Sequence, residues 1–344
     1  MKKNLSVIIS ILLMLTFLTL PSLASTKAAL PTSAGIGALR GQFQSGKAPK
    51  TDGFALDYEY YSPVGDNDTN KYPLVIFLHG IGHGESVGSQ LRDSDMPYWA
   101  SSELQSRFTD GGAFILLPRA PENLNMFWGE SLIDPLRALI DDFIKQHKNN
   151  IDTTRIAISG SSQGGTMVWM MLKSYPEYFA TAFPLASTEA PTANNVKAAA
   201  GTAIWLFASS KDPVVSYSLS TLPTWNKILE NNARPELCRL TTLGTVYNPD
   251  GSRSSDNHHI AKVITYDLKM LSGAAYPETS TQNGLGATVN TNSDGIIKWI
   301  SSVHSGFNGN TTGESTANVF NRILEAFRNF FLQIVHLFQM MFGL

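Results

Sequence analysis

The sequence predicts an α/β fold in which a mostly parallel sheet carries helices on both faces. Short apolar runs recur along the middle of the chain, and amphipathic stretches of helical length separate them. This alternation is the element order of a doubly wound sheet. With 43% hydrophobic and only 16% charged residues, the chain can also bury the large core that such a sheet needs.

The expected strands begin with an alternating segment at 54–61 and a continuous apolar run at 72–78. Continuous runs are typical of parallel strands that are covered on both faces. Further strands are expected at 113–117, 155–159, 181–185, 203–208 and 237–247. The intervening helices are expected at 132–147, 163–174 and 223–231, with one more directly after residue 259.

The first 24 residues have the layout of a secretory signal peptide. Lys2 and Lys3 form a basic head, residues 7–20 are almost entirely apolar, and small residues precede a cleavage point after Ala24. We therefore expect a secreted or cell-surface bacterial protein, with an uncleaved membrane anchor as the alternative. A loose lead-in is expected at 25–53, followed by the main domain at 54–304.

The C-terminal part is expected to be separate. Residues 305–317 are rich in Gly, Asn and Thr and resemble a linker. Residues 318–344 form an amphipathic helix whose apolar face, within 318–342, is too large to stay bare in water. We expect it to contact a membrane surface or another protein surface.

Composition excludes several classes of function. A net charge of −2 provides no basic face for nucleic acid. The single cysteine, Cys238, permits no internal disulfide and is predicted to be a small buried residue. No His/Cys cluster has zinc-ligand spacing, so we predict neither a metal nor a cofactor.

The strongest motif is Gly160-Ser161-Ser162-Gln163-Gly164-Gly165, between an expected strand and an expected helix. A nucleophile on so sharp a turn needs glycines two residues before and after it, which predicts Ser162 as the nucleophile. A serine hydroxyl needs a histidine base, which a carboxylate orients. Asp212, just past the strand at 203–208, is the predicted acid.

The histidine is expected after Asp212, because nucleophile, acid and base follow this order in such folds. His259 is the first choice and His258 the second, and His304 borders the linker. Negative charge on the attacked carbonyl oxygen needs backbone amide donors. We assign these to Ile81, in the glycine-rich loop after 72–78, and to Gln163. Trp99, Phe127 and Trp128 either line an acyl or aromatic pocket or cap the core.

With these motifs the chain resembles bacterial esterases of the α/β-hydrolase fold, related to polyhydroxybutyrate depolymerases and to feruloyl or acetylxylan esterases. It is most similar to the branch often labelled predicted peptidase. The resemblance spans residues 54–302. It is carried by 71–80, 151–165, 175–180 and 204–215, with 296–300 similar to the family's closing helix.

The resemblance implies hydrolysis of carboxylic esters, either small molecules or esters linked to polysaccharide, through an acyl-enzyme. Two departures stand out: Gln163 replaces a frequent Met, and Asn257-His258-His259-Ile260 replaces a Gly-His-Xaa-Xaa-Trp stretch. The alternatives are a serine peptidase of the same fold and a non-catalytic surface-binding protein on a hydrolase scaffold.

Overall fold

A single nine-stranded sheet organises the part of the chain that the computed structural model describes. The described residues are 33–65, 68–81, 88–92, 96–125, 127–245, 259, 279–289 and 295–305. The strands are β1 (Gln44–Lys47), β2 (Asp57–Tyr61), β3 (Tyr72–Leu78), β4 (Phe114–Pro118), β5 (Ile151–Ser161), β6 (Thr181–Leu185), β7 (Ala203–Ser209), β8 (Arg239–Leu243) and β9 (Thr279–Asn283).

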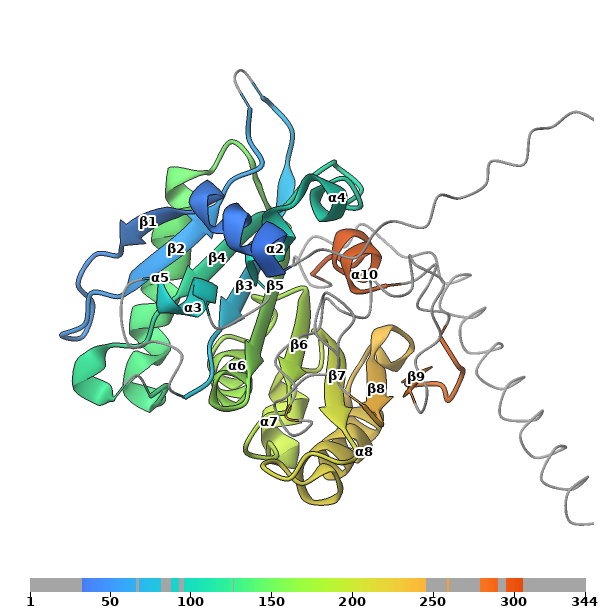
Figure 1. Cartoon of the computed structure of the whole chain (residues 1–344). Coiled ribbons are helices and arrows are strands. Elements are labelled where there is room, and N and C mark those ends of the chain that lie inside the picture. Colours follow the sequence, from blue (N-terminus) through green and yellow to red (C-terminus); the bar gives the residue numbers. More distant parts are fainter. Residues whose placement is uncertain are drawn as a thin grey trace, which may run out of the picture.

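The strand order is β1-β2-β4-β3-β5-β6-β7-β8-β9. The central strands from β4 to β8 pair in parallel, whereas β1, β2 and β9 add antiparallel edges. Figure 1 shows these strands as one twisted layer. The predicted fold class, a mostly parallel doubly wound sheet, is confirmed.

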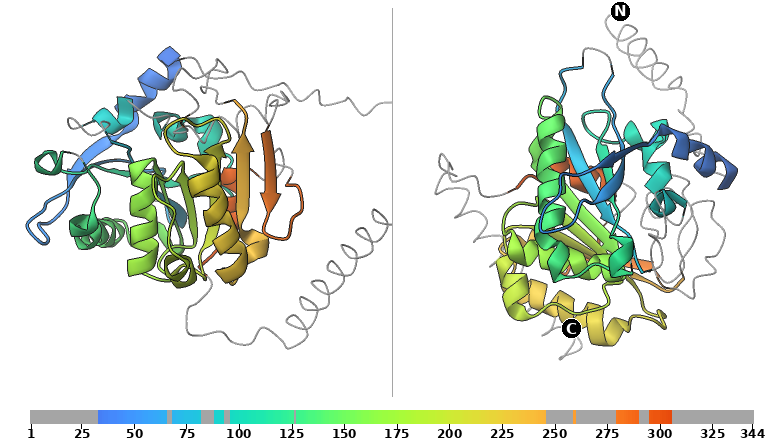
Figure 2. Two further views of the ribbon diagram at one scale, coloured as in Figure 1. Left: turned by 90° about the horizontal axis from the view of Figure 1, so that it is seen from below. Right: turned by 90° about the vertical axis from the view of Figure 1, so that its left-hand side faces the viewer.

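Helices cover both faces of this sheet (Figure 2). One face packs against α5 (Ile133–Gln146), α6 (Gln163–Ser174), α7 (Ala193–Ala198) and α8 (Leu222–Asn231). The other packs against short elements, namely α3 (Ser89–Arg92), the 3-10 helix Met96–Ala100, α4 (Ser102–Gln105) and α10 (Ile296–Ser302). Because both faces are covered, β3 is buried along its whole length, as its uninterrupted apolar sequence predicts.

The lead-in predicted to be loose contains ordered elements. It holds α2 (Ser33–Leu39) and strand β1, which pairs with β2 in the register Gln44↔Tyr60 to Lys47↔Asp57. The sequence analysis did not predict β1 because its sequence is short and polar. An edge strand is stabilised by backbone pairing and needs little apolar surface. The sheet therefore begins before residue 54.

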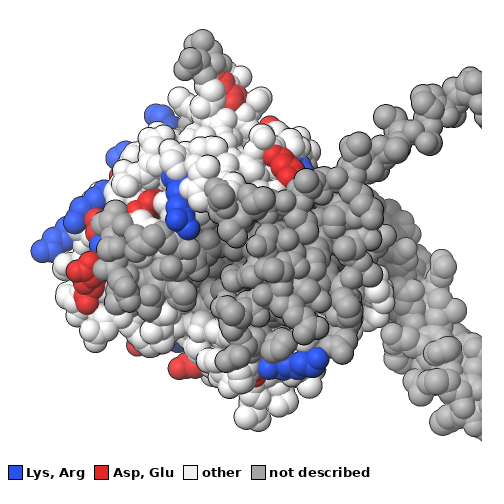
Figure 3. All heavy atoms as spheres, in the orientation of Figure 1, with Lys and Arg blue, Asp and Glu red and all other residues white. Residues whose placement is uncertain are grey.

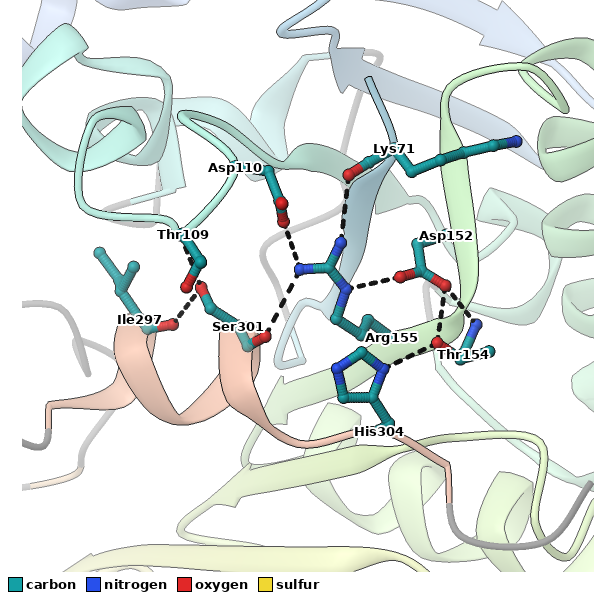
Figure 4. Close-up of polar contacts among 9 residues, drawn as sticks. All are labelled: Lys71, Thr109, Asp110, Asp152, Thr154, Arg155, Ile297, Ser301 and His304. Carbon is teal, nitrogen blue, oxygen red and sulfur yellow. Dashed lines mark hydrogen bonds and ion pairs between the residues drawn. The ribbon is translucent and has the colours of Figure 1, made fainter. Parts of the chain in front are cut away.

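A charged cluster around the buried Arg155 ties the amino-terminal edge of the sheet to α10 (Figure 4). Arg155 of β5 donates to Asp152 Oδ2 at 2.7 Å, to Asp110, and to the carbonyl oxygens of Lys71 (3.1 Å) and Ser301 (3.4 Å). Burial works against its charge, but its bonds to the two carboxylates outweigh this and raise the pKa of Arg155. The cluster therefore fixes the edge of the sheet opposite to its carboxyl ends.

The predicted signal peptide (1–24), linker (305–317, apart from residue 305) and tail helix (318–344) lie outside the described residues, so those assignments stay predictions. Among the described helices, none has both the length and the apolar character required to cross a bilayer. On the face seen in Figure 3, the charged side chains of described residues include both signs, which is consistent with the low net charge.

Candidate active site

Ser162 sits at the sharp turn between β5 and α6. Its backbone has φ 56° and ψ −117°, a conformation that costs a non-glycine residue free energy and is held only by its surroundings. A Cβ on Gly160 would lie 2.5 Å from Gly164 backbone atoms, and one on Gly164 would lie 2.2 Å from the Leu78 carbonyl oxygen. The two glycines are therefore required by close backbone contacts on both sides of Ser162.

Asp212 and His259 form a hydrogen-bonded pair. His259 Nδ1 lies 2.7 Å from Asp212 Oδ2, and the Asp212 side chain is fully buried. Its other oxygen accepts from the backbone amides of Val214 (2.8 Å) and Val215 (2.9 Å). Burial alone would raise the pKa of Asp212, but the bonds from His259 and these amides outweigh it, so its pKa is lowered. The carboxylate stays ionised and holds the imidazole in one orientation.

The sheet brings these residues to one edge. Ser162 follows β5 and Asp212 follows β7, and β6 is the single strand between them. The backbone locks the three strand ends together, because Ser162 N donates to Leu185 O at 2.8 Å and Ala186 N donates to Phe207 O at 3.0 Å. The carboxyl ends of parallel strands are where ligand sites form in such sheets.

Of the other two candidate histidines, the structure describes His304 but not His258. His304 Nδ1 lies 2.9 Å from Thr154 Oγ1, near the amino-terminal end of β5 and therefore at the edge opposite Ser162 (Figure 4). This position rules out His304 as a base for Ser162. His258 lies outside the described residues.

The two assigned amide donors lie in the segments that follow β3 and β5. Gln163 follows it directly, and Ile81 lies three residues beyond the end of β3, whose Leu78 pairs with Gly160 of β5. The Ile81 side chain is 57% exposed, whereas Gln163 is buried. Both residues therefore belong to segments that leave neighbouring strands at the same edge. The rest of the glycine-rich loop, 82–87, lies outside the described residues.

Two of the three aromatic residues pack in the core. Trp99 and Trp128 are fully buried, and Trp99 stacks on Phe183. Of the two alternatives, lining a pocket or capping the core, the burial of both rings supports the second for Trp99 and Trp128. Only Phe127, 48% exposed, remains a candidate contact. Cys238 is buried as predicted, and burial raises the pKa of its thiol to about 12.

A polar hydrogen-bond unit joins the segments around the site. The Gln163 side chain bonds the backbone of Trp128, and the Trp128 indole bonds the His79 carbonyl oxygen. The sequence analysis assigned no role to His79 and used only the main chain of Gln163. The one signal in the sequence was the replacement of the frequent Met by Gln163.

Comparison with known proteins gives matches to parts of the chain. The family model described as prolyl oligopeptidase family matches residues 122–221. Feruloyl esterase B of Neurospora crassa is 26% identical in an alignment over 132 residues that covers 35% of this chain and 40% of that protein. A solved structure of a thermostable esterase is 28% identical, with a TM-score of 0.50. The match covers 60% of this chain and 55% of the esterase chain.

An acylaminoacyl peptidase from Pyrococcus horikoshii also matches, with 16% identity and a TM-score of 0.40. That match covers 55% of this chain and 35% of the peptidase chain. The matches to the two esterases span about half the length of those proteins. The sheet and these similarities assign the α/β-hydrolase fold to the chain. Within that class it is similar to esterases.

Proposed function

We propose that this protein hydrolyses carboxylic esters through an acyl-enzyme formed on Ser162. The observation that carries the proposal is the Asp212–His259 hydrogen bond, made by a fully buried carboxylate, one strand away from a serine on a strained strand-to-helix turn. His259 is bound through Nδ1, so Nε2 is the nitrogen that takes a proton. In this role Asp212 keeps the tautomer and stabilises the imidazolium.

In the proposed first step, the Ser162 Oγ attacks the ester carbonyl carbon while His259 Nε2 accepts its proton. The negative charge that develops on the carbonyl oxygen is received by the amides of Ile81 and Gln163. The intermediate then collapses, and His259 returns the proton to the leaving alcohol. Water repeats the sequence on the acyl-enzyme, which releases the acid and restores Ser162.

For the substrate, we propose short-chain, hydroxycinnamoyl or acetyl-sugar esters. Similarity to a feruloyl esterase and a thermostable esterase supports an ester over an amide substrate. The second candidate is a serine peptidase, which the prolyl oligopeptidase model over residues 122–221 favours. A panel of matched ester and amide substrates separates the two, because a peptidase cleaves the amide of the same acyl group efficiently.

The test of the active site uses 4-nitrophenyl acetate. Wild-type protein should release a burst of nitrophenol equal to the enzyme concentration, and a fluorophosphonate probe should label Ser162. Ser162→Ala and His259→Ala should abolish turnover, whereas the matched histidine control His304→Ala, at the opposite edge, should keep it. Full activity in Ser162→Ala would sink the proposal. If only His258→Ala is inactive, the base has been misassigned.

We also propose that the protein is exported to the outside of a bacterial cell. The pattern in residues 1–24 supports this: a basic head, an apolar run and small residues before the cleavage point. Amino-terminal sequencing of protein secreted by a bacterial host should begin at Ser25. A mature protein that still begins at Met1 contradicts cleavage.

A further inference from the structure

Three chain segments meet beside Ser162 through a buried glutamine. Gln163 is 3% exposed, and both ends of its amide bond one residue of the loop after β4. Its Oε1 accepts from the Trp128 backbone amide at 2.9 Å, and its Nε2 donates to the Trp128 carbonyl oxygen. A side-chain amide thus pairs with a backbone unit as a neighbouring strand would, which fixes Trp128 relative to α6.

Trp128 carries the connection on to the loop after β3. Its indole Nε1 donates to the His79 carbonyl oxygen at 3.0 Å, and the two rings lie 5.2 Å apart. His79 is itself held, since Nε2 accepts from Ala120 N at 3.1 Å and Nδ1 donates to Gly80 O at 2.8 Å. We call Gln163, Trp128 and His79 the clasp.

The clasp connects the two amides that the proposed function requires. Gln163 bears one donor, and His79 lies two residues before Ile81, which bears the other. An oxyanion is stabilised only when both donors point at the same spot, about 2.7–3.1 Å from it. These donors leave different strands, so their relative position depends on what joins the segments beyond the sheet. The clasp does so with directional bonds in a buried environment, where such bonds tolerate little displacement.

We propose that the Gln163 side chain is a positioning residue that sets the spacing of the two oxyanion donors through Trp128 and His79. The inference rests on the proposed function and deepens it. Gln163 acts through its side-chain amide here, in addition to the main-chain amide assigned above. A methionine at this position would fill the space with no hydrogen bond to Trp128, so the clasp would lose its link to α6.

The first test compares Gln163→Met with a matched control elsewhere in the fold. Gln105 is also buried, and its side chain also bonds two backbone groups, Trp99 O at 2.7 Å and Ala113 N at 2.8 Å. Ala113 precedes β4, at the amino-terminal edge. Gln163→Met should lower kcat for 4-nitrophenyl acetate about 10- to 100-fold, a part of what a lost oxyanion donor costs, with KM within about threefold. Gln105→Met should leave kcat unchanged while lowering Tm to a similar extent.

The second test removes the next bond in the clasp. Trp128→Phe keeps a buried ring and loses the donor to His79. Its control is Trp299→Phe, which loses an equivalent bond from Nε1 to Leu237 O at 2.9 Å on α10. Trp128→Phe should lower kcat, Trp299→Phe should not, and the double variant with Gln163→Met should lose much less than the product of the single losses.

The third measurement separates positioning from general destabilisation. A trifluoromethyl ketone forms a tetrahedral adduct with an oxyanion, so its affinity should fall in parallel with kcat/KM across the clasp variants. Gln163→Met that retains kcat within about threefold, or an inhibitor affinity that does not change, overturns the positioning role. Failure of the proposed function is recognised separately, because wild-type protein would then not be labelled at Ser162.

Discussion

Glu59, a buried acid on β2, should make the stability of this protein fall as the pH rises. Glu59 is 2% exposed, and within the described structure neither carboxylate oxygen has a hydrogen-bond partner of good geometry. Burial raises the pKa of Glu59 from 4.5 to about 7, although the Gly88 amide and the Arg119 guanidinium act in the opposite direction. Folding therefore favours the protonated acid.

The sign follows from linkage between folding and protonation. The pKa of Glu59 is higher in the folded protein than in the unfolded chain. Below pH 4.5 the acid is neutral in both states and does not affect stability. As the pH rises toward about 7, the unfolded chain ionises more readily, so the free energy of unfolding falls. The loss in the free energy of unfolding corresponds to roughly 3 kcal/mol, at about 1.36 kcal/mol per pKa unit. Relaxation of the surroundings and water penetration around a buried charge reduce this to about 2 kcal/mol.

The perturbation that tests this is Glu59→Gln, which keeps the shape and removes the charge. The variant should match wild type at pH 4 and exceed its Tm by about 4–8 °C at pH 8, at roughly 2–4 °C per kcal/mol for a large domain. Scanning calorimetry at pH 4, 6 and 8 measures it. The exposed Glu230→Gln, on α8, controls for a change in net charge. A Tm difference between Glu59→Gln and wild type that does not grow with pH would refute the reasoning.

Three further predictions concern the site and the core. Gly164→Ala should lower both Tm and activity strongly, because its Cβ would lie 2.2 Å from the Leu78 carbonyl oxygen; calorimetry and an ester assay measure this, and a wild-type Tm contradicts it. Asp212→Asn should lower kcat about 10³–10⁴-fold by disturbing the His259 tautomer, and a loss below tenfold in steady-state kinetics would remove Asp212 from the mechanism. The Cys238 thiol, buried with its pKa raised to about 12, should react with a disulfide reagent only after denaturant is added, and fast labelling of folded protein would disprove this.

Much of the fold could be predicted because hydrophobic periodicity is a local property. The segments expected at 72–78, 163–174 and 181–185 coincide with β3, α6 and β6 residue for residue. The turn at Ser162 could equally be predicted from its flanking glycines, since a tight turn restricts which residues can occupy it. By contrast, β1 was missed because its four residues, Gln44–Lys47, are polar and depend on pairing with β2.

The sequence by itself determined the strands from β2 to β8, the helices α5, α6 and α8, the turn that carries Ser162 and the position of Asp212 after a buried strand. Only the tertiary structure decided that His259 bonds Asp212, 47 residues away in the sequence. It also decided that Trp99 and Trp128 face the core, and that the Gln163 side chain bonds the backbone of Trp128, 35 residues away. The reason is physical. Secondary structure follows the spacing of apolar residues within a few turns, whereas a hydrogen-bond partner is chosen by whichever distant segment the packed core brings within about 3 Å.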